Sequence, residues 1–143
     1  MREILFKGKR LDNGEWVEGA YCSIVCDDSF TPMIERPCIV DLEFGFWYEV
    51  DPDTVSQFTG LCDKNNVRIF EGDIVHILGD WESENWRGVN YNALIAFIDG
   101  GFCAIDGTIE EHGFRRYALA RMDFTLEVIG NIHDNPELLE VEG

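Results

Sequence analysis

The chain has 143 residues, 45% of them hydrophobic, and its 28 acidic against 11 basic residues give a net charge of −17. This length suits one ordinary domain or two small subdomains. Because nucleic acids and anionic membranes are bound through lysine and arginine, the charge argues against direct binding to either. No stretch reaches the roughly 20 apolar residues that cross a bilayer, and no signal peptide is recognised at the start, so we expect a cytoplasmic protein.

The acidic residues are spread unevenly. Residues 27–57 hold eight acids against Arg36 alone, and residues 122–143 hold six acids and no base. The excess is either a solvated surface that keeps the protein soluble, or an acidic face that binds a basic partner or imitates the nucleic-acid backbone.

The N-terminal part predicts a hairpin. Asp12-Asn13-Gly14 supplies the positive-φ positions of a tight turn between two runs of β-forming residues. Residues 27–45 are less regular, because Pro32 and Pro37 limit any strand there to an edge or a short piece.

Two segments predict short helical turns. Asp51 suits an N-cap with Pro52 at the first helical position and the acid Asp53 after it. Asn135 and Pro136 repeat this pattern and predict a short terminal helix or a fraying turn.

The remaining regular segments are short β-rich runs separated by glycine, asparagine and aspartate. They are VRIF, DIVHIL, NALIAFI, FCAI and LEVIGNI. Their spacing is typical of a small barrel or sandwich. We therefore predict a mainly β protein, α+β with minor helix, made of two β-rich subdomains of short antiparallel strands and hairpins. They span residues 1–57 and 58–143, and the second is the small barrel or sandwich.

The longest segment without a clear period, residues 79–92, carries Trp81, Trp86 and Tyr91 among polar residues. Exposed aromatic side chains are frequent anchors of interfaces, so this segment could be a recognition loop. The alternative is a long hairpin whose aromatic side chains fold back on the sheet.

The stretch TGLCDKNNVRIFEGDIV invites comparison with a calcium-binding loop, which needs oxygen ligands at alternating positions. Counted from Asp63, Asn65 fits the third position. However, Val67 replaces the fifth ligand, Arg68 replaces the turn glycine, and Ile74 replaces the bidentate glutamate. The pattern instead favours a polar turn at residues 63–66, a short strand, and a second turn at 72–73 that leads into an apolar strand.

Catalytic and metal-binding patterns are not found. The histidines His76, His112 and His133 show no spacing of zinc ligands, and His76 is expected to be an ordinary strand residue. No phosphate-binding glycine pattern occurs, and Gly45 and Gly100-Gly101 are expected to form hairpin turns. We therefore assign no catalytic residue, no metal ligand and no cofactor.

The cysteines do not indicate a disulfide framework or a zinc site, because their number is odd and they lack paired spacing. They are Cys22, Cys26, Cys38, Cys62 and Cys103. Neighbouring acids such as Glu110 and Glu111 arise from the abundance of acids alone.

Three segments resemble the YopX family, small proteins of phages and prophages of Gram-positive bacteria. They are MREILFKGKRLDNGEWVEGAY, YEVDPDTVSQFTGLCDKNNVRIFEGDIV and EVIGNIHDNPELL, at the two ends and the middle of the chain. The resemblance implies a mostly β protein, a phage or prophage origin and a bacterial cytoplasm. It implies no biochemical activity, cofactor or site residue.

The leading hypothesis is an accessory protein that is not an enzyme and that binds a host or phage protein. One alternative is an acidic mimic of nucleic acid that blocks a host DNA- or RNA-binding protein. Another is a metal-dependent hydrolase that uses scattered carboxylates such as Asp51, Asp53, Glu71 and Asp73. A third alternative is a structural component of phage assembly. On general grounds a small phage protein of this kind can also form a homo-oligomer.

Overall fold

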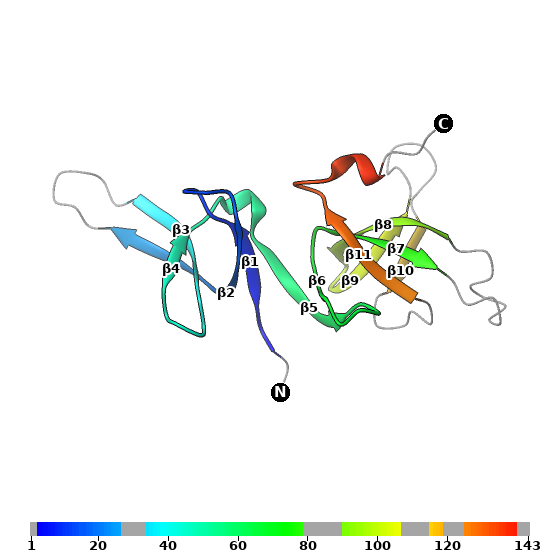
Figure 1. Cartoon of the computed structure of the whole chain (residues 1–143), viewed down its shortest axis with the longest axis horizontal. Coiled ribbons are helices and arrows are strands. Elements are labelled where there is room, and N and C mark those ends of the chain that lie inside the picture. The colour runs from blue at the N-terminus through cyan, green and yellow to red at the C-terminus, as the bar shows by residue number, and fades with distance from the viewer. Residues whose placement is uncertain (1–2, 27–33, 79–89, 107–114, 119–124, 140–143) are drawn as a thin grey trace. The chain divides into compact units, whose positions relative to one another are not determined.

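The computed structural model describes residues 3–26, 34–78, 90–106, 115–118 and 125–139. By the density of contacts the chain divides into two compact units, unit 1 (Met1–Phe58) and unit 2 (Thr59–Gly143). Nearly every regular element is a strand, which confirms the prediction of a mainly β protein (Figure 1). No helix in the described ranges is long and apolar enough to cross a membrane.

Unit 1 is an antiparallel sheet in which β1 pairs with both β2 and β5, and β3 lies between β2 and β4. Its elements are β1 (Phe6–Lys9), β2 (Trp16–Cys26), β3 (Ile34–Val40), β4 (Trp47–Glu49), the 3-10 turn η1 (Pro52–Thr54) and the start of β5 (Ser56–Cys62). The rest of β5 belongs to unit 2. In the order of the strands, β4-β3-β2-β1-β5-β6, β5 has β6 as its other neighbour.

The chain that leaves β4 returns to the end of β1. The Leu11 N–H donates to the Glu49 carbonyl at 3.0 Å, and the Asp51 N–H donates to the Lys9 carbonyl at 2.9 Å. Val50, between these two bonds, is fully buried. This return places the β1–β2 loop beside β4.

The β1–β2 hairpin is present as predicted, but its turn differs from the expected one. Four residues, 11–14, form the loop, and the Gly14 N–H donates to the Arg10 carbonyl at 3.0 Å. Only Gly14 has a positive φ (72°), whereas the sequence pattern predicted positive φ at neighbouring positions too. The four-residue loop requires a left-handed residue only at its last position, which is why the single glycine is sufficient.

The β3–β4 hairpin has the same loop. The Gly45 N–H donates to the Asp41 carbonyl at 2.8 Å, and Gly45 has a φ of 73°. The Asp41 side chain also accepts from the Glu43 N–H at 2.8 Å. The glycine turn expected at Gly45 is therefore confirmed.

Pro37 lies in a longer strand than we predicted. β3 has seven residues and pairs with β2 along its whole length. β3 pairs with β4 only from Cys38 onward. The Val50 N–H donates to the Pro37 carbonyl at 3.0 Å. The proline is accommodated because it stands at the end of the β4 pairing, where no ladder N–H is required of it.

The helical turn expected after Asp51 is confirmed as η1. The Asp51 side chain caps the turn by accepting from the Asp53 N–H at 3.0 Å. Thr54 is buried, and its hydroxyl oxygen accepts from the Lys9 N–H at 2.8 Å. The turn thus also attaches to β1.

Unit 2 is a five-stranded sheet of order β10-β9-β8-β7-β11 (Figure 1). The elements of the unit are β6 (Arg68–Phe70), β7 (Asp73–Leu78), β8 (Asn90–Ile98), β9 (Gly101–Asp106), β10 (Arg115–Ala118), β11 (Thr125–Asn131) and the 3-10 turn η3 (Pro136–Leu139). In the described residues β10 and β11 are the two edge strands of this sheet, so the described strands do not close into a barrel. The unit is sandwich-like. β10 was not predicted, because its sequence RRYA has no apolar alternation.

The core of unit 2 lies between β6 and one face of this sheet. Its buried members are Ile69, Val75, Ile77, Ala93, Ile95 and Ala104. The expected strands β6, β7, β8, β9 and β11 are confirmed. The hairpin turn predicted at Gly100-Gly101 lies one residue earlier: Asp99 and Gly100 form it with φ of 52° and 81°, and Gly101 is the first residue of β9.

We predict that Gly19→Ala destabilises unit 1, because a Cβ at this position would come within 1.9 Å of the Val40 carbonyl oxygen. The expected loss in the free energy of unfolding is about 1–3 kcal/mol, measured by urea denaturation. Gly101→Ala is the matched control, since a Cβ there meets nothing within 4 Å. Equal stabilities of the two variants would contradict the close approach of β2 and β3.

Candidate functional site

Asp63, the residue that first suggested a cation site, is a structural acceptor. Its side chain is 8% exposed. One carboxylate oxygen accepts from the N–H groups of Asn65 and Val67 at 2.8 and 2.9 Å. The other accepts from the N–H of Val128 at 2.9 Å. One oxygen therefore closes the β5–β6 turn, which confirms the predicted turn, and the other joins this turn to β11.

The electrostatics of Asp63 agree with this structural role. Burial by itself would raise the pKa of its carboxyl group. The N–H donors of Val128, Val67 and Asn65, together with the charge of Lys64, outweigh burial and lower the pKa below its usual value. The ionised form is the one that accepts all three hydrogen bonds.

The other carboxylates considered for a hydrolase are divided between the units. Asp51 caps η1 in unit 1, where Asp53 is exposed. In unit 2 Asp73 is 2% exposed and accepts from the Phe70 N–H at 2.8 Å, and Glu71 precedes it. Among the described residues, no three histidine, cysteine or acidic side chains come together in a way that could hold a metal ion.

The two histidines that the structure describes lie on separate segments. His76 lies in β7, where its Nδ1 is 2.9 Å from Oδ1 of Asn92 on β8, and the Asn92 amide donates to the Leu138 carbonyl at 2.9 Å. His133 is exposed after β11. His112, like Glu110 and Glu111, lies outside the described residues.

In the part of the chain that the structure describes, no disulfide joins Cys22, Cys38, Cys62 and Cys103, and Cys38 and Cys103 are buried. Cys26 ends β2.

The proposed recognition loop at residues 79–92 is only partly covered by the structure. Trp81 and Trp86 lie outside the described residues. Tyr91 belongs to β8, where it pairs with Ile77, so the end of this segment is a strand and not a loop.

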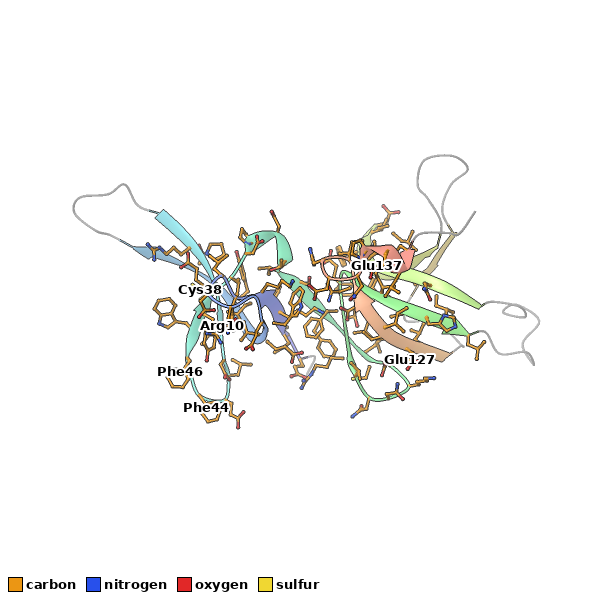
Figure 2. The ribbon with its side chains drawn as sticks, turned by 45° about the horizontal axis from the view of Figure 1, so that its top comes forward. Arg10, Cys38, Phe44, Phe46, Glu127 and Glu137 are labelled. Atoms are coloured by element: carbon orange, nitrogen blue, oxygen red, sulfur yellow. The ribbon has the colours of Figure 1, made fainter. Side chains whose placement is uncertain are left out.

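A surface that the sequence reasoning missed lies in unit 1, on residues 10–15 and 41–49, which include the two four-residue loops and β4. We call it the hairpin-loop surface. Its large apolar side chains are Leu11 (59% exposed), Leu42 (65%), Phe44 (68%), Phe46 (61%) and Trp47 (57%). The rings of Phe44 and Phe46 lie 6.4 Å apart, and both side chains stand outside the sheet at the β3–β4 loop (Figure 2). Phe44 lies beside Phe46, and Leu11 and Trp47 line the same depression, so these side chains are neighbours and not single scattered residues.

A depression of about 370 Å³ adjoins these side chains. It is lined by Leu11, Asp12, Trp47, Tyr48 and Glu49. This volume is within the range of ligand pockets, roughly 300–1,000 Å³. The depression exists because the end of β4 returns to β1.

Arg10 orders one wall of the depression. Its guanidinium group lies 4.2 Å from the centre of the Tyr48 ring and donates to both carboxylate oxygens of Asp12, at 2.9 and 2.6 Å. This hydrogen-bonded pair raises the pKa of Arg10 and lowers the pKa of Asp12. The second carboxylate, Glu49, has a looser partner in Arg36 at 3.8 Å.

The run LEFGFW at residues 42–47 indicates an exposed apolar surface in the sequence itself. Four large apolar residues surround the turn glycine Gly45. A tight hairpin loop cannot bury its own side chains, so apolar residues at such a loop must face outward unless another element covers them.

The YopX family, described as YopX protein, matches residues 6–140. This chain belongs to the YopX family. No curated protein matches it. A solved structure similar to this YopX chain is protein EF1440 from Enterococcus faecalis, with 28% identity, a TM-score of 0.49, and coverage of 98% of this chain and 100% of that one.

For this YopX chain we predict that Asp63→Asn lowers the free energy of unfolding by about 1–3 kcal/mol at neutral pH, because an amide nitrogen would face a buried N–H donor. The pKa of Asp63 is lower in the folded state. The contribution of ionised Asp63 to the free energy of unfolding is therefore present above the unfolded-state pKa of about 4. It is lost as the pH falls through the folded-state pKa. Urea unfolding across the acid range measures the difference between wild type and variant, which should shrink at low pH.

The control for this prediction is Asp53→Asn, which changes an exposed carboxylate. Its stability should follow that of the wild type across the same pH range. A stability loss for Asp63→Asn that is independent of pH would contradict the charged acceptor.

Proposed function

We propose that this YopX-family chain is an accessory protein, encoded by a phage or prophage, that acts in the bacterial cytoplasm by binding another protein through the hairpin-loop surface. The observation that supports the proposal is that residues 10–15 and 41–49 carry five large apolar side chains, each more than half exposed. Phe44 lies beside Phe46, and Leu11 and Trp47 line one depression. The phage origin and the compartment are inferences from family membership.

The surface has the composition of a binding site. Burying an exposed phenylalanine or leucine side chain releases about 1.5–3 kcal/mol, and here this gain is available only when another surface covers the loops. Aromatic side chains also dominate the binding energy of many interfaces, because they present a large area with little rotamer entropy. The loop backbones are held by their own hydrogen bonds, so a partner would meet a preorganised surface.

The alternatives have less support. A mimic of nucleic acid presents carboxylates in place of phosphates, and large aromatic side chains contribute nothing to that imitation. A hydrolase would need acids that are available to a ligand, whereas Asp51 and Asp73 each accept a hydrogen bond from a backbone N–H and stabilise a turn. Both observations favour a protein partner.

We predict that replacing Phe44 and Phe46 together by serine abolishes capture of the partner. Loss of two aromatic anchors, at about 2 kcal/mol each, weakens binding by roughly three orders of magnitude. The measurement is affinity capture from lysates of Gram-positive bacteria followed by mass spectrometry, with wild type and variant side by side. Folding is checked by urea denaturation, which should be unchanged because both side chains are exposed.

The matched control replaces Leu61 and Phe97 by serine. These apolar side chains of unit 2 are also exposed, at 42% and 53%. The control should retain every protein that the wild type captures and that the Phe44 and Phe46 variant loses. If all three proteins capture the same set, the hairpin-loop surface is not the binding site.

A further inference from the structure

The hairpin-loop surface carries a strong excess of negative charge. Its two loops and β4, residues 10–15 and 41–49, contain five acids, Asp12, Glu15, Asp41, Glu43 and Glu49, against one base, Arg10. Arg10 is already committed to Asp12. In the described part of the chain neither Asp41 nor Glu43 forms an ion pair. Apolar side chains and uncompensated carboxylates thus alternate along the β3–β4 loop.

The depression continues this combination of apolar and acidic groups. Trp47 and Leu11 supply apolar walls, and Glu49 supplies a carboxylate. Its ion pair with Arg36 is long, at 3.8 Å, and partly solvated, because 45% of the Arg36 side chain and 37% of the Glu49 side chain are exposed. Such a site suits a side chain with an apolar stem and a cationic tip. The stem packs on the indole and leucine, the cation lies near an aromatic ring, and the carboxylate accepts its N–H groups.

We infer that the partner contributes a segment in which a large apolar residue neighbours arginine or lysine. The basic side chain enters the depression beside Trp47 and pairs with Glu49, while the apolar residue packs on Phe44 and Phe46. A second basic residue of the segment reaches Glu43. This inference rests on the proposed function, and it specifies the chemistry of the partner.

Charge complementarity selects this occupant over two others. A second copy of the chain would bring a net charge of −17 and the same acidic loops against this surface. Nucleic acid would bring phosphates to the carboxylates. A basic and apolar protein segment removes both apolar area and unbalanced charge in one contact.

The test is selection from a random linear peptide library on the full chain, followed by titration of the selected peptides by isothermal calorimetry. We expect the peptides to combine arginine or lysine with a large apolar residue. Replacing Glu43 and Glu49 together by glutamine should weaken their binding at least about tenfold, since two charge-assisted hydrogen bonds are lost. Higher salt should reduce wild-type binding and leave the variant less affected.

The matched control, Asp53→Asn with Glu137→Gln, changes the net charge equally at two exposed acids that do not belong to residues 10–15 or 41–49. It should bind the peptides as the wild type does. Equal weakening of control and variant, or selected peptides without basic residues, overturns the inference.

The aromatic variant separates this inference from the proposed function. If the peptides require Phe44 and Phe46 but bind equally well without the carboxylates of Glu43 and Glu49, the proposed function stands. In that case only the inference of a basic partner segment is overturned. Peptides that bind without Phe44 and Phe46, or a library that yields no binder, overturn both. Light scattering that shows a wild-type dimer, dissociated by the Phe44 and Phe46 replacements, identifies a second copy as the occupant and also overturns the basic partner.

Discussion

Two backbone hydrogen bonds organise unit 1, because they bring the end of β4 back to the end of β1. One joins Leu11 to Glu49 and the other joins Asp51 to Lys9. Val50 lies between these bonds and is fully buried. Its side chain packs against Gly8, where a Cβ would come within 3.1 Å of it. Without this return the β1–β2 loop would not lie beside β4, and the depression between Leu11 and Trp47 would not exist. The candidate binding surface is thus a consequence of how the sheet curls.

The acids of this protein serve two different purposes. Asp63 and Asp73 are buried and accept hydrogen bonds from backbone N–H groups, so they stabilise turns and are unavailable to a ligand. Glu43 and Glu49, on the hairpin-loop surface, retain oxygens that face solvent or a loose partner. Among the described residues the distinction is made by burial and by the number of N–H donors nearby. The number of acidic residues in the sequence cannot distinguish these two groups.

The two hairpin loops explain why apolar and acidic residues meet at one surface. The sequences LDNG and LEFG both place a leucine first, an acid second and a left-handed glycine last. Each loop closes with a bond from its glycine N–H to the carbonyl before the loop. This closure leaves no space inside the loop, so the leucine and the phenylalanine side chains face outward. The loop geometry therefore produces the apolar surface that the proposed partner covers.

The sequence by itself determined the local features: the mainly β class, most strands, the β1–β2 hairpin, the capped turn after Asp51 and the turn at Asp63. These depend on residues close in the chain, such as an aspartate before a proline or a polar cluster between apolar runs. It also carried the signature of the YopX family. Only the tertiary structure decided which acids are buried, that Pro37 stands within a seven-residue strand, and that the two loops adjoin β4 to form one surface. Those properties depend on strand order and on pairing between distant residues, which local patterns do not specify.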